Sequence, residues 1–539
     1  MKIALIVPVI NSDIVDEEIG MGIAANMLKQ KGHEVLFTAL HEHKENYEQI
    51  LEFGPSLVGI ITYSDTIAYV KSLSKVLKEM NNDTRIVLIG YAATHHYKEL
   101  LTEPSLIDYA ILGEFEESLC ELTDMLHKSE SNYENIKGLA YRNSTGVSVT
   151  ARRNLLPQLD TLPYPDRSIM LQENLSYAKL QGSRGCQLNC CSFCCETGFW
   201  EKSTSPWRGR SPKNIVDEIE LIIKQHNIYK INFSDNNYTD PDRSSDRVIE
   251  IADLLIKRGL PITYFVNIRS DFHHYISDDE MQYLIKSGYR GALLGFEAAN
   301  QADLNLYGKA ITVDDNMRAA EIFDKYNLGV DCGFININPY SSLENLQNNI
   351  DFLHKFEYMS YFTNLTKLKL FQGTSLFKKV QNDGLLKDSG EINIFDYEYY
   401  DPQIRKLVKF LNDYFYPMNE SHHIMHRVRY FGVYFIQDTL NLLNYFEKVC
   451  TDITAVELLK ECIANVNAEL KRFNDVNYQW FNHLISFAEN DISEDEIYSL
   501  SKHMMSLELI LGYIEKLNHL KFAGYRNIIR HDKKYASIL

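Results

Sequence analysis

The sequence predicts an α/β protein that consists of a doubly wound amino-terminal domain, a partial (β/α)6 barrel and a mostly α-helical carboxyl-terminal region. Short apolar runs alternate with helical patterns from residue 2 to about residue 370, and this rhythm ends after Gly373-Thr-Ser-Leu376. Between the two alternating halves, five cysteines fall within ten positions, Cys186 to Cys195. Alternation of helices with fully apolar strands is typical of parallel sheets that are covered on both faces.

The composition excludes several classes of protein. Of the 539 residues 45% are apolar, which suffices for real cores, and no run of eighteen apolar residues would span a membrane. The formal net charge of −18 opposes binding to a phosphate backbone. The cysteines are clustered rather than spaced as a disulfide framework, which indicates a reducing compartment. We therefore expect a cytoplasmic protein that binds neither nucleic acid nor a membrane.

The first domain is predicted over residues 1–130. Strands are expected at 2–8, 34–38, 57–62, 85–90 and 107–112, and helices at 14–31, 67–80 and 115–127. Doubly wound sheets bind ligands at the carboxyl ends of their strands, and no Gly-x-Gly-x-x-Gly or Walker motif indicates a nucleotide there. The candidate ligand residues at these ends are Pro8, Val9, Asn11, Thr62, Tyr63, Ser64, Gly90, Tyr91, Ala92, Gly113, Glu114 and Glu116.

Residues 131–175 are predicted to link the two alternating halves. A short hairpin over 138–142 and 146–151 precedes Leu159-Asp-Thr-Leu-Pro-Tyr-Pro-Asp-Arg167. Two prolines in this segment fix φ and oppose regular structure.

The cysteine loop, Cys186-Gln-Leu-Asn-Cys-Cys-Ser-Phe-Cys-Cys195, is expected to bind a soft metal centre. Cysteine is the usual ligand of iron–sulfur clusters, whereas a closed zinc site needs four ligands. No histidine lies nearby, and this favours a cluster. A structural zinc knuckle or buried thiols are the alternatives.

Residues 176–386 are predicted to form six strand–helix units. Strands are expected at 177–181, 230–233, 262–268, 290–296, 329–336 and 364–370, with helices at 213–226, 247–257, 278–287, 313–326 and 342–355. In such barrels the functional groups gather at the carboxyl ends of the strands. Asp235, Asn267, Arg269 and Glu297 lie at these ends.

Residues 387–539 are predicted to be a helical domain that caps the active site and shapes the substrate pocket. Helical spacing of apolar residues is found at 402–416, 426–447, 455–473, 477–490 and 494–521.

Several of these motifs resemble those of the cobalamin-dependent radical S-adenosylmethionine (SAM) enzymes. Gly90-Tyr-Ala-Ala-Thr-His-His96 and Gly113-Glu-Phe-Glu116 are similar to the family's Gly-Gly-x-His and Gly-Glu-x-Glu turns, and the proline segment resembles its Leu-Pro-x-Pro-Asp bridge. In the barrel, Asp235-Asn-Asn, Asn267-Ile-Arg and Gly295-Phe-Glu are similar to its Asp-Asp-Asn, Asn-x-Arg and Gly-x-Glu-Ser motifs. The resemblance covers roughly residues 1–386.

The resemblance implies three cofactors. A flavodoxin-like first domain would bind cobalamin at the strand-end residues named above, although an empty or merely structural sheet is an alternative. The usual Asp-x-His-x-x-Gly signature is absent, so the cobalt would lack a lower histidine ligand, and His95 and His96 are interpreted as a solvated helix start. A 4Fe–4S cluster held by three cysteines would leave one iron open for SAM, with Phe193, Asp235, Asn267, Arg269 and Glu297 on the SAM side.

The family's cysteine pattern, Cys-x-x-x-Cys-x-aromatic-Cys, fits in two ways. Choosing Cys190 keeps the first spacing and stretches the second, whereas choosing Cys191 keeps Cys191-Ser-Phe-Cys194 intact. Because the second turn is the more constrained half, Cys186, Cys191 and Cys194 are the predicted ligands.

The activity implied by the resemblance is reductive cleavage of SAM and hydrogen abstraction from unactivated carbon. C-methylation of a small molecule is the favoured outcome, with electrons from an external donor such as flavodoxin or ferredoxin. Alternatives are a cobalamin-dependent rearrangement or cyclisation, radical modification of a ribosomally made peptide, and a corrinoid- or cluster-binding sensor without catalysis. A methylthiotransferase is disfavoured, because the first domain has Cys120 as its single cysteine.

Overall fold

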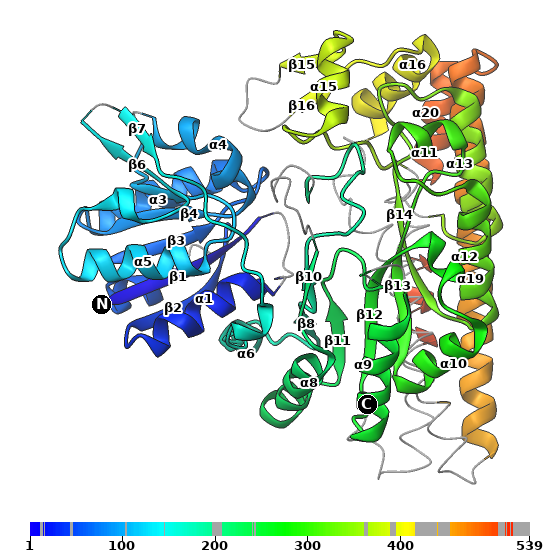
Figure 1. Ribbon diagram of the computed structural model, residues 1–539. Coiled ribbons are helices and arrows are strands. Elements are labelled where there is room, and N and C mark those ends of the chain that lie inside the picture. The colour runs from blue at the N-terminus through cyan, green and yellow to red at the C-terminus, as the bar shows by residue number, and fades with distance from the viewer. Residues whose placement is uncertain are drawn as a thin grey trace.

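A computed structural model describes residues 1–10, 15, 17–43, 47–102, 105–144, 146–196, 207–239, 241, 244–359, 365–388, 395–415, 439, 443, 453–504, 512–513, 515–517 and 519–520. An amino-terminal α/β domain stands beside a second parallel sheet with its own helices, and a long helix runs along the far side of the latter (Figure 1). This arrangement confirms the predicted fold class.

The amino-terminal domain is built on a seven-stranded sheet of order β2-β1-β3-β4-β5-β6-β7. Its first five strands are parallel: β1 (Lys2–Val9), β2 (Glu34–His41), β3 (Leu57–Ile61), β4 (Arg85–Ile89) and β5 (Tyr109–Ile111). This order is that of flavodoxin-like domains. The hairpin expected in the linker, β6 (Leu139–Asn143) and β7 (Gly146–Val149), extends the same sheet in antiparallel fashion.

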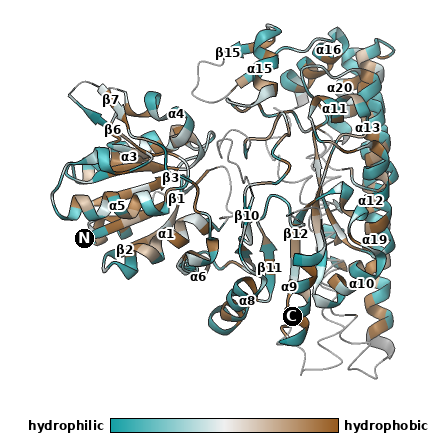
Figure 2. Cartoon of the chain, viewed as in Figure 1, coloured by the Kyte–Doolittle hydropathy of each residue, from teal (hydrophilic) through white to brown (hydrophobic). Residues whose placement is uncertain are grey.

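Helices cover both faces of this sheet because successive residues of a strand point to opposite sides. Ile3 and Leu5 of β1 pack with α1 (Ile19–Gln30) and α5 (Glu116–His127). Ala4 and Ile6 pack with α3 (Ile67–Met80) and α4 (Tyr91–Leu101) on the other side. The strands are accordingly the most apolar elements of the domain (Figure 2). Two helices were not predicted, α2 (Glu48–Phe53) and α4.

The proline segment of the linker lies against α1. The Asn26 side chain donates a hydrogen bond to the carbonyl of Tyr164 (2.8 Å), and the amide of Asp166 donates to the carbonyl of Gly22 (2.9 Å). Beyond it, α6 (Ser168–Gln172) contacts β2. Residues 164–172 of the linker are therefore packed against the first domain.

We predict that Gly22→Ala destabilises the protein. A methyl group at Gly22 would lie 2.6 Å from the carbonyl oxygen of Asp166 and 2.9 Å from the Cβ of Pro165, so the linker must shift. Overpacking of this kind costs about 1–3 kcal/mol in the free energy of unfolding, measured by urea denaturation. Gly20→Ala is the matched control on the same helix. Its methyl group would lie 3.1 Å from the ring of Phe115, a side chain that can shift more easily than the backbone. An equal or larger loss in the control would contradict the prediction.

The second domain contains a five-stranded parallel sheet of order β14-β13-β12-β11-β8. Its strands are β8 (Ala178–Leu180), β11 (Lys230–Phe233), β12 (Thr263–Arg269), β13 (Tyr289–Glu297) and β14 (Gly329–Phe334). The helices between and after them are α8 (Pro212–His226), α9 (Asp246–Lys257), α10 (Asp278–Ser287), α11 (Gln301–Leu306), α12 (Val313–Lys325) and α13 (Leu343–Lys355). These strands confirm the first five predicted barrel strands. Of the sixth, expected at 364–370, the described part contributes a single parallel bridge between Ile337 and Lys367.

In the carboxyl-terminal region, α16 (Pro402–Phe410) and α20 (Glu494–Met504) accompany one long helix, α19 (Ile453–Glu489). The expectation of two helices, at 455–473 and 477–490, is wrong. Asn474 continues the helix while its side chain bonds the carbonyl of His354 at 3.0 Å and the amide of Met359 at 3.2 Å. α19 contacts α13 and runs along the outer side of the barrel helices (Figure 1). Most of the helix predicted at 426–447 lies outside the described residues.

Among the described residues, no helix combines the length and apolar character needed to cross a bilayer.

Candidate cofactor site

The cysteine loop is fixed to the barrel by the residues between its later cysteines. The amide of Ser192 donates to the carbonyl of Tyr307 (2.8 Å) and its hydroxyl to the carbonyl of Leu306 (2.6 Å). Phe193 packs edge-on against the ring of Tyr307, with centroids 5.4 Å apart. The amide of Cys194 approaches the carbonyl of Cys191 at 3.4 Å, which closes a tight turn. Ser192 and Phe193 therefore hold the Cys191–Cys194 turn against the loop that follows α11.

The two adjacent cysteines have different surroundings. Cys190 is exposed, and its thiol donates to the carbonyl of Gly308 at 3.4 Å. Cys191 is half-buried, and burial raises the pKa of its thiol to about 12 while the nearby ammonium of Lys309 opposes that rise. Cys191 also lies on the turn that Ser192 fixes to the barrel, whereas Cys190 is exposed. This placement favours Cys191 over Cys190, and the set Cys186, Cys191 and Cys194 stays a prediction.

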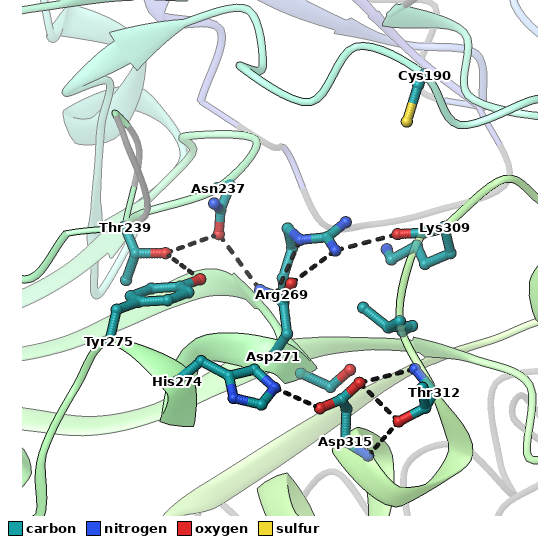
Figure 3. A network of polar contacts seen from close by, with 12 residues as sticks. Cys190, Asn237, Thr239, Arg269, Asp271, His274, Tyr275, Lys309, Thr312 and Asp315 are labelled. Carbon is teal, nitrogen blue, oxygen red and sulfur yellow. Dashed lines mark hydrogen bonds and ion pairs between the residues drawn. The ribbon is translucent and has the colours of Figure 1, made fainter.

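Polar side chains from the strand ends form a network around Arg269 (Figure 3). Cys191 is close enough to Lys309, Glu297 and Arg269 to interact with their charges. Arg269, at the end of β12, binds Asp271 through two hydrogen bonds of 3.0 and 2.9 Å and donates to the carbonyl of Lys309 at 3.0 Å. The Lys309 ammonium lies 2.5 Å from a carboxylate oxygen of Glu297, at the end of β13. Two of the predicted residues, Arg269 and Glu297, thus lie together near Cys191.

Lys309 was missed by the sequence reasoning. It is buried, which is rare for an unpaired lysine. Burial acts to lower its pKa, but Glu297 and Cys191 outweigh burial and hold that pKa above its ordinary value. The residue is therefore a charged ammonium inside the site. In the sequence, Lys309 is simply a lysine after Tyr307-Gly308, between two helices. Lysines in such positions are too common for this one to be recognised as a functional residue.

Asp235 and Asn267 contact the residues that lead into the cysteine loop. Asp235 is fully buried, accepts a hydrogen bond from the amide of Gly182 at 2.8 Å, and accepts another from the hydroxyl of Ser183. The Asn267 side chain donates to the carbonyl of Asp235 at 3.0 Å. Burial raises the pKa of Asp235. These residues position the strand that leads into the loop, and a direct contact with SAM stays a prediction for both.

The predicted strand-end residues of the first domain lie at one edge of its sheet. Gly90 and Gly113 have φ values of +98° and +86°, a left-handed conformation that favours glycine. The hydroxyl of Tyr63 donates to Glu18 at 2.6 Å, and the ring of Tyr91 packs against Phe371 of the second domain at 5.6 Å. Pro8, Val9, Thr62, Ser64 and Ala92 occupy the same edge, whereas Asn11 lies outside the described residues.

His96 is buried and His95 half-buried, which corrects the expectation that both are solvated. His96 is 3% exposed, and the ring of His95 packs at a tilt against Tyr91 with centroids 4.5 Å apart. Burial, with His96 and Arg152 nearby, lowers the pKa of His95 to about 4, so its imidazole is neutral. Its buried Nε2 atom has no hydrogen-bond partner among the described residues. A buried Nε2 atom without a hydrogen-bond partner among the described residues is consistent with a site that binds a polar ligand.

Glu114 and Glu116, predicted as cobalamin contacts, instead bind arginines of the second domain. Arg184 lies 3.1 Å from Glu114 and 2.5 Å from Glu116, and Arg208 lies 2.7 Å from Glu114. Burial acts to raise the pKa of Glu114, but the two arginines outweigh burial and lower it. These buried ion pairs join the Gly-Glu-x-Glu turn to β9 (Ser183–Arg184), directly before the cysteine loop. A contact with cobalamin stays a prediction for both carboxylates.

A cavity of about 210 Å³ lies between the two domains. Glu17, Glu18 and Gly20 line it from the first domain, and Gln181, Ser183, Gly185, Ser234 and Asn236 line it from the second. Glu196, just after the last cysteine of the loop, also lines it, and burial raises the pKa of this carboxyl to about 6. The cavity therefore connects the cysteine loop with the amino-terminal domain.

Two family models match this chain. A B12 binding domain matches residues 7–123, and the radical SAM superfamily matches residues 180–353. Among curated proteins, the anaerobic magnesium-protoporphyrin IX monomethyl ester cyclase of Rubrivivax gelatinosus is 29% identical over 53% of this chain and 52% of its own length. The chain thus spans about half the length of that relative.

Solved structures share the fold. The cobalamin-dependent SAM radical enzyme OxsB, with aqua-cobalamin and SAM bound, superposes with a TM-score of 0.72 at 16% identity, covering 97% of this chain and 84% of OxsB. The radical SAM methyltransferase TsrM of Kitasatospora setae, with tryptophan and a SAM analog bound, gives 0.55 at 15% identity over 72% of this chain and 78% of TsrM. At these identities the likeness concerns the fold.

Proposed function

The chain belongs to the radical SAM superfamily and joins that domain to a B12 binding domain, and from this premise we propose that it is an enzyme that cleaves SAM reductively and abstracts hydrogen from unactivated carbon. The observation that carries the proposal is the meeting of Cys191, Lys309, Glu297 and Arg269 at the strand ends. When bound, a 4Fe–4S cluster supplies the electron for this cleavage and cobalamin supplies a corrinoid cobalt.

The cysteine loop would hold the cluster. Cys186, Cys191 and Cys194 provide three thiolates, and three protein ligands leave one metal position open, as in catalytic metal sites. Ser192 anchors the loop, so two of the three thiols are carried on a turn with a fixed position. Phe193 lies in that turn, between the cluster ligands and Tyr307.

Lys309 and Glu297 would receive the amino-acid end of SAM. That end carries one carboxylate and one ammonium, and a buried pair of opposite charges provides a partner for each. Arg269 holds the backbone carbonyl of Lys309 and is itself held by Asp271. Arg269 therefore acts on this pair by positioning it.

Cobalamin would lie at the sheet edge formed by Pro8, Thr62, Gly90 and Gly113. Gly90 and Gly113 allow close backbone approach because they lack side chains. The neutral His95 offers a buried Nε2 toward a polar group of the ligand.

The fate of the substrate radical has two candidate outcomes. C-methylation of a small molecule is the outcome predicted from the motifs, and the TsrM fold, that of a named methyltransferase, supports it. Ring closure without methyl transfer is supported by the 29% identity to a cyclase. The substrate is a small molecule or a peptide, and the electron comes from an external donor such as flavodoxin or ferredoxin.

Anaerobic turnover tests the proposal. Protein reconstituted with iron and sulfide, given cobalamin, SAM and dithionite, is expected to form 5′-deoxyadenosine, measured by chromatography and mass spectrometry. Failure after full cluster loading would overturn the proposal in favour of a sensor without catalysis. With the true substrate, S-adenosylhomocysteine formed alongside 5′-deoxyadenosine selects methylation, and its absence selects ring closure or rearrangement.

We predict that Lys309→Met weakens SAM binding by about tenfold to a hundredfold, because a hydrogen bond to a charged group contributes about 1.5–3 kcal/mol. Equilibrium dialysis with SAM and the cluster-loaded protein measures the effect. Lys325→Met is the matched control, because Lys325 forms an exposed ion pair with Asp278. Unchanged SAM affinity in Lys309→Met, with cluster content intact, would contradict the assignment.

A further inference from the structure

A second group of potential metal ligands, His273, His274 and Asp315, lies outside the cysteine loop. Figure 3 shows two of them, His274 and Asp315. His273 and His274 end the 3-10 helix η3 (Ser270–His274), and Asp315 lies in the first turn of α12. One donor atom of each residue lies within 4.8 Å of the others. The Nε2 atoms of His273 and His274 are 3.4 and 2.7 Å from the same oxygen, Oδ1 of Asp315. Two imidazoles and a carboxylate thus converge on one point.

A hydrogen bond to the backbone orients the ring of His273 toward that point. Its Nδ1 lies 3.1 Å from the carbonyl oxygen of Ser270. Because a carbonyl only accepts, Nδ1 donates this hydrogen bond, and Nε2 is the ring nitrogen that faces Asp315. A backbone carbonyl on the other ring nitrogen is typical of metal-binding histidines.

The two carboxylate oxygens of Asp315 have different partners. Its Oδ2 accepts hydrogen bonds from the amide and the hydroxyl of Thr312, both at 2.7 Å, within the capping box of α12. Oδ1 is directed to the two histidines. The helix cap therefore fixes the orientation in which Oδ1 is presented.

We propose that His273, His274 and Asp315 bind one divalent transition-metal ion, for which Zn²⁺ is the probe. Metal–ligand bonds of about 2.1 Å at tetrahedral angles place neighbouring ligand atoms about 3.4 Å apart. The separation between His273 and Asp315 already has this value. His274 would move outward by roughly 0.7 Å to reach the same spacing, and its side chain is 62% exposed and free to do so. Solvent fills the remaining position.

The ion would tie η3 to α12 next to the SAM side of the barrel. The hydroxyl of Ser270 already donates to Asn316 of α12 at 2.5 Å. The same turn carries Arg269 and Asp271, so a metal here would hold the position of Arg269 without touching the cluster ligands. The site is independent of the proposed activity, since none of its ligands belongs to the cysteine loop.

Zinc binding to the cluster-loaded holoenzyme tests the site. A filled cluster is needed because free cysteines also bind zinc, and iron content is checked before and after. By equilibrium dialysis and elemental analysis, the wild type is expected to bind one more Zn²⁺ per chain than His274→Ala, and zinc is expected to raise the Tm of the wild type but not that of His274→Ala. His354→Ala is the control, because His354 faces the single carboxylate of Asp475 on α19 at 2.9 Å.

Two results would overturn the proposal. One is an equal zinc stoichiometry in wild type and His274→Ala with full clusters in both. The other is loss of the ion in His354→Ala but not in His274→Ala. His273→Gln provides a second variant that removes a ligand while keeping a polar side chain, so a folding defect in one variant leaves the test intact.

Discussion

Cys194→Ala and Cys191→Ala are each expected to abolish formation of 5′-deoxyadenosine, whereas Cys190→Ala is expected to retain most of it. A cluster ligand cannot be replaced by alanine without loss of the metal site that cleaves SAM. Cys191 and Cys194 lie on the turn that Ser192 fixes to the barrel, and Cys191 lies beside the Lys309 ammonium. The Cys190 thiol instead faces solvent and the carbonyl of Gly308.

The three variants form an internal comparison, because each removes one thiol from the same loop. Iron and sulfide content, the visible absorbance of the reconstituted protein and the rate of 5′-deoxyadenosine formation are measured for each. The ligand assignment fails if Cys190→Ala loses the cluster while Cys191→Ala keeps it. Cys195→Ala serves as a further control, because Cys195 is not a predicted ligand.

Elements with strong periodicity were predicted well from the sequence. The helix at 67–80 has the predicted bounds, since its apolar residues follow one face over four turns. The helix α4, which begins at Tyr91, was missed because Tyr91-Ala-Ala-Thr-His-His96 has little apolar periodicity, and its backbone is irregular at His96. The helices expected at 455–473 and 477–490 form one helix, α19, in which the Asn474 side chain bonds the end of α13.

The site was predictable only in part, because sequence motifs do not reveal partners that are distant in the chain. The cysteine loop and the strand-end residues Arg269 and Glu297 could be predicted as site residues from local sequence motifs. Lys309 becomes recognisable only through its burial beside Glu297. Glu114 matches a motif, but its pairing with Arg184, 70 residues later, depends on how the domains pack.

Arg167→Met is expected to lower the free energy of unfolding by about 3–5 kcal/mol, the usual cost of removing one partner from a buried ion pair. Arg167 ends the proline segment and is buried between two carboxylates, Glu17 of the first domain at 2.5 Å and Glu218 of α8 at 2.6 Å. Glu17 also accepts from the amide of Lys179 at 2.8 Å, at the start of the barrel. Without the guanidinium, Glu17 has no cation among these partners, and burial already raises the pKa of its carboxyl.

Lys224→Met is the matched control on α8, because Lys224 forms an exposed ion pair with Glu220 and such pairs contribute at most about 1 kcal/mol. Urea denaturation of both variants, followed by circular dichroism, measures the difference. Because Arg167 joins the linker to both domains, we also expect limited proteolysis of Arg167→Met to cleave between the domains before either is degraded. A loss for Arg167→Met as small as that of the control would show that methionine packs in this position and that the domains are held by the Arg184 and Arg208 ion pairs instead.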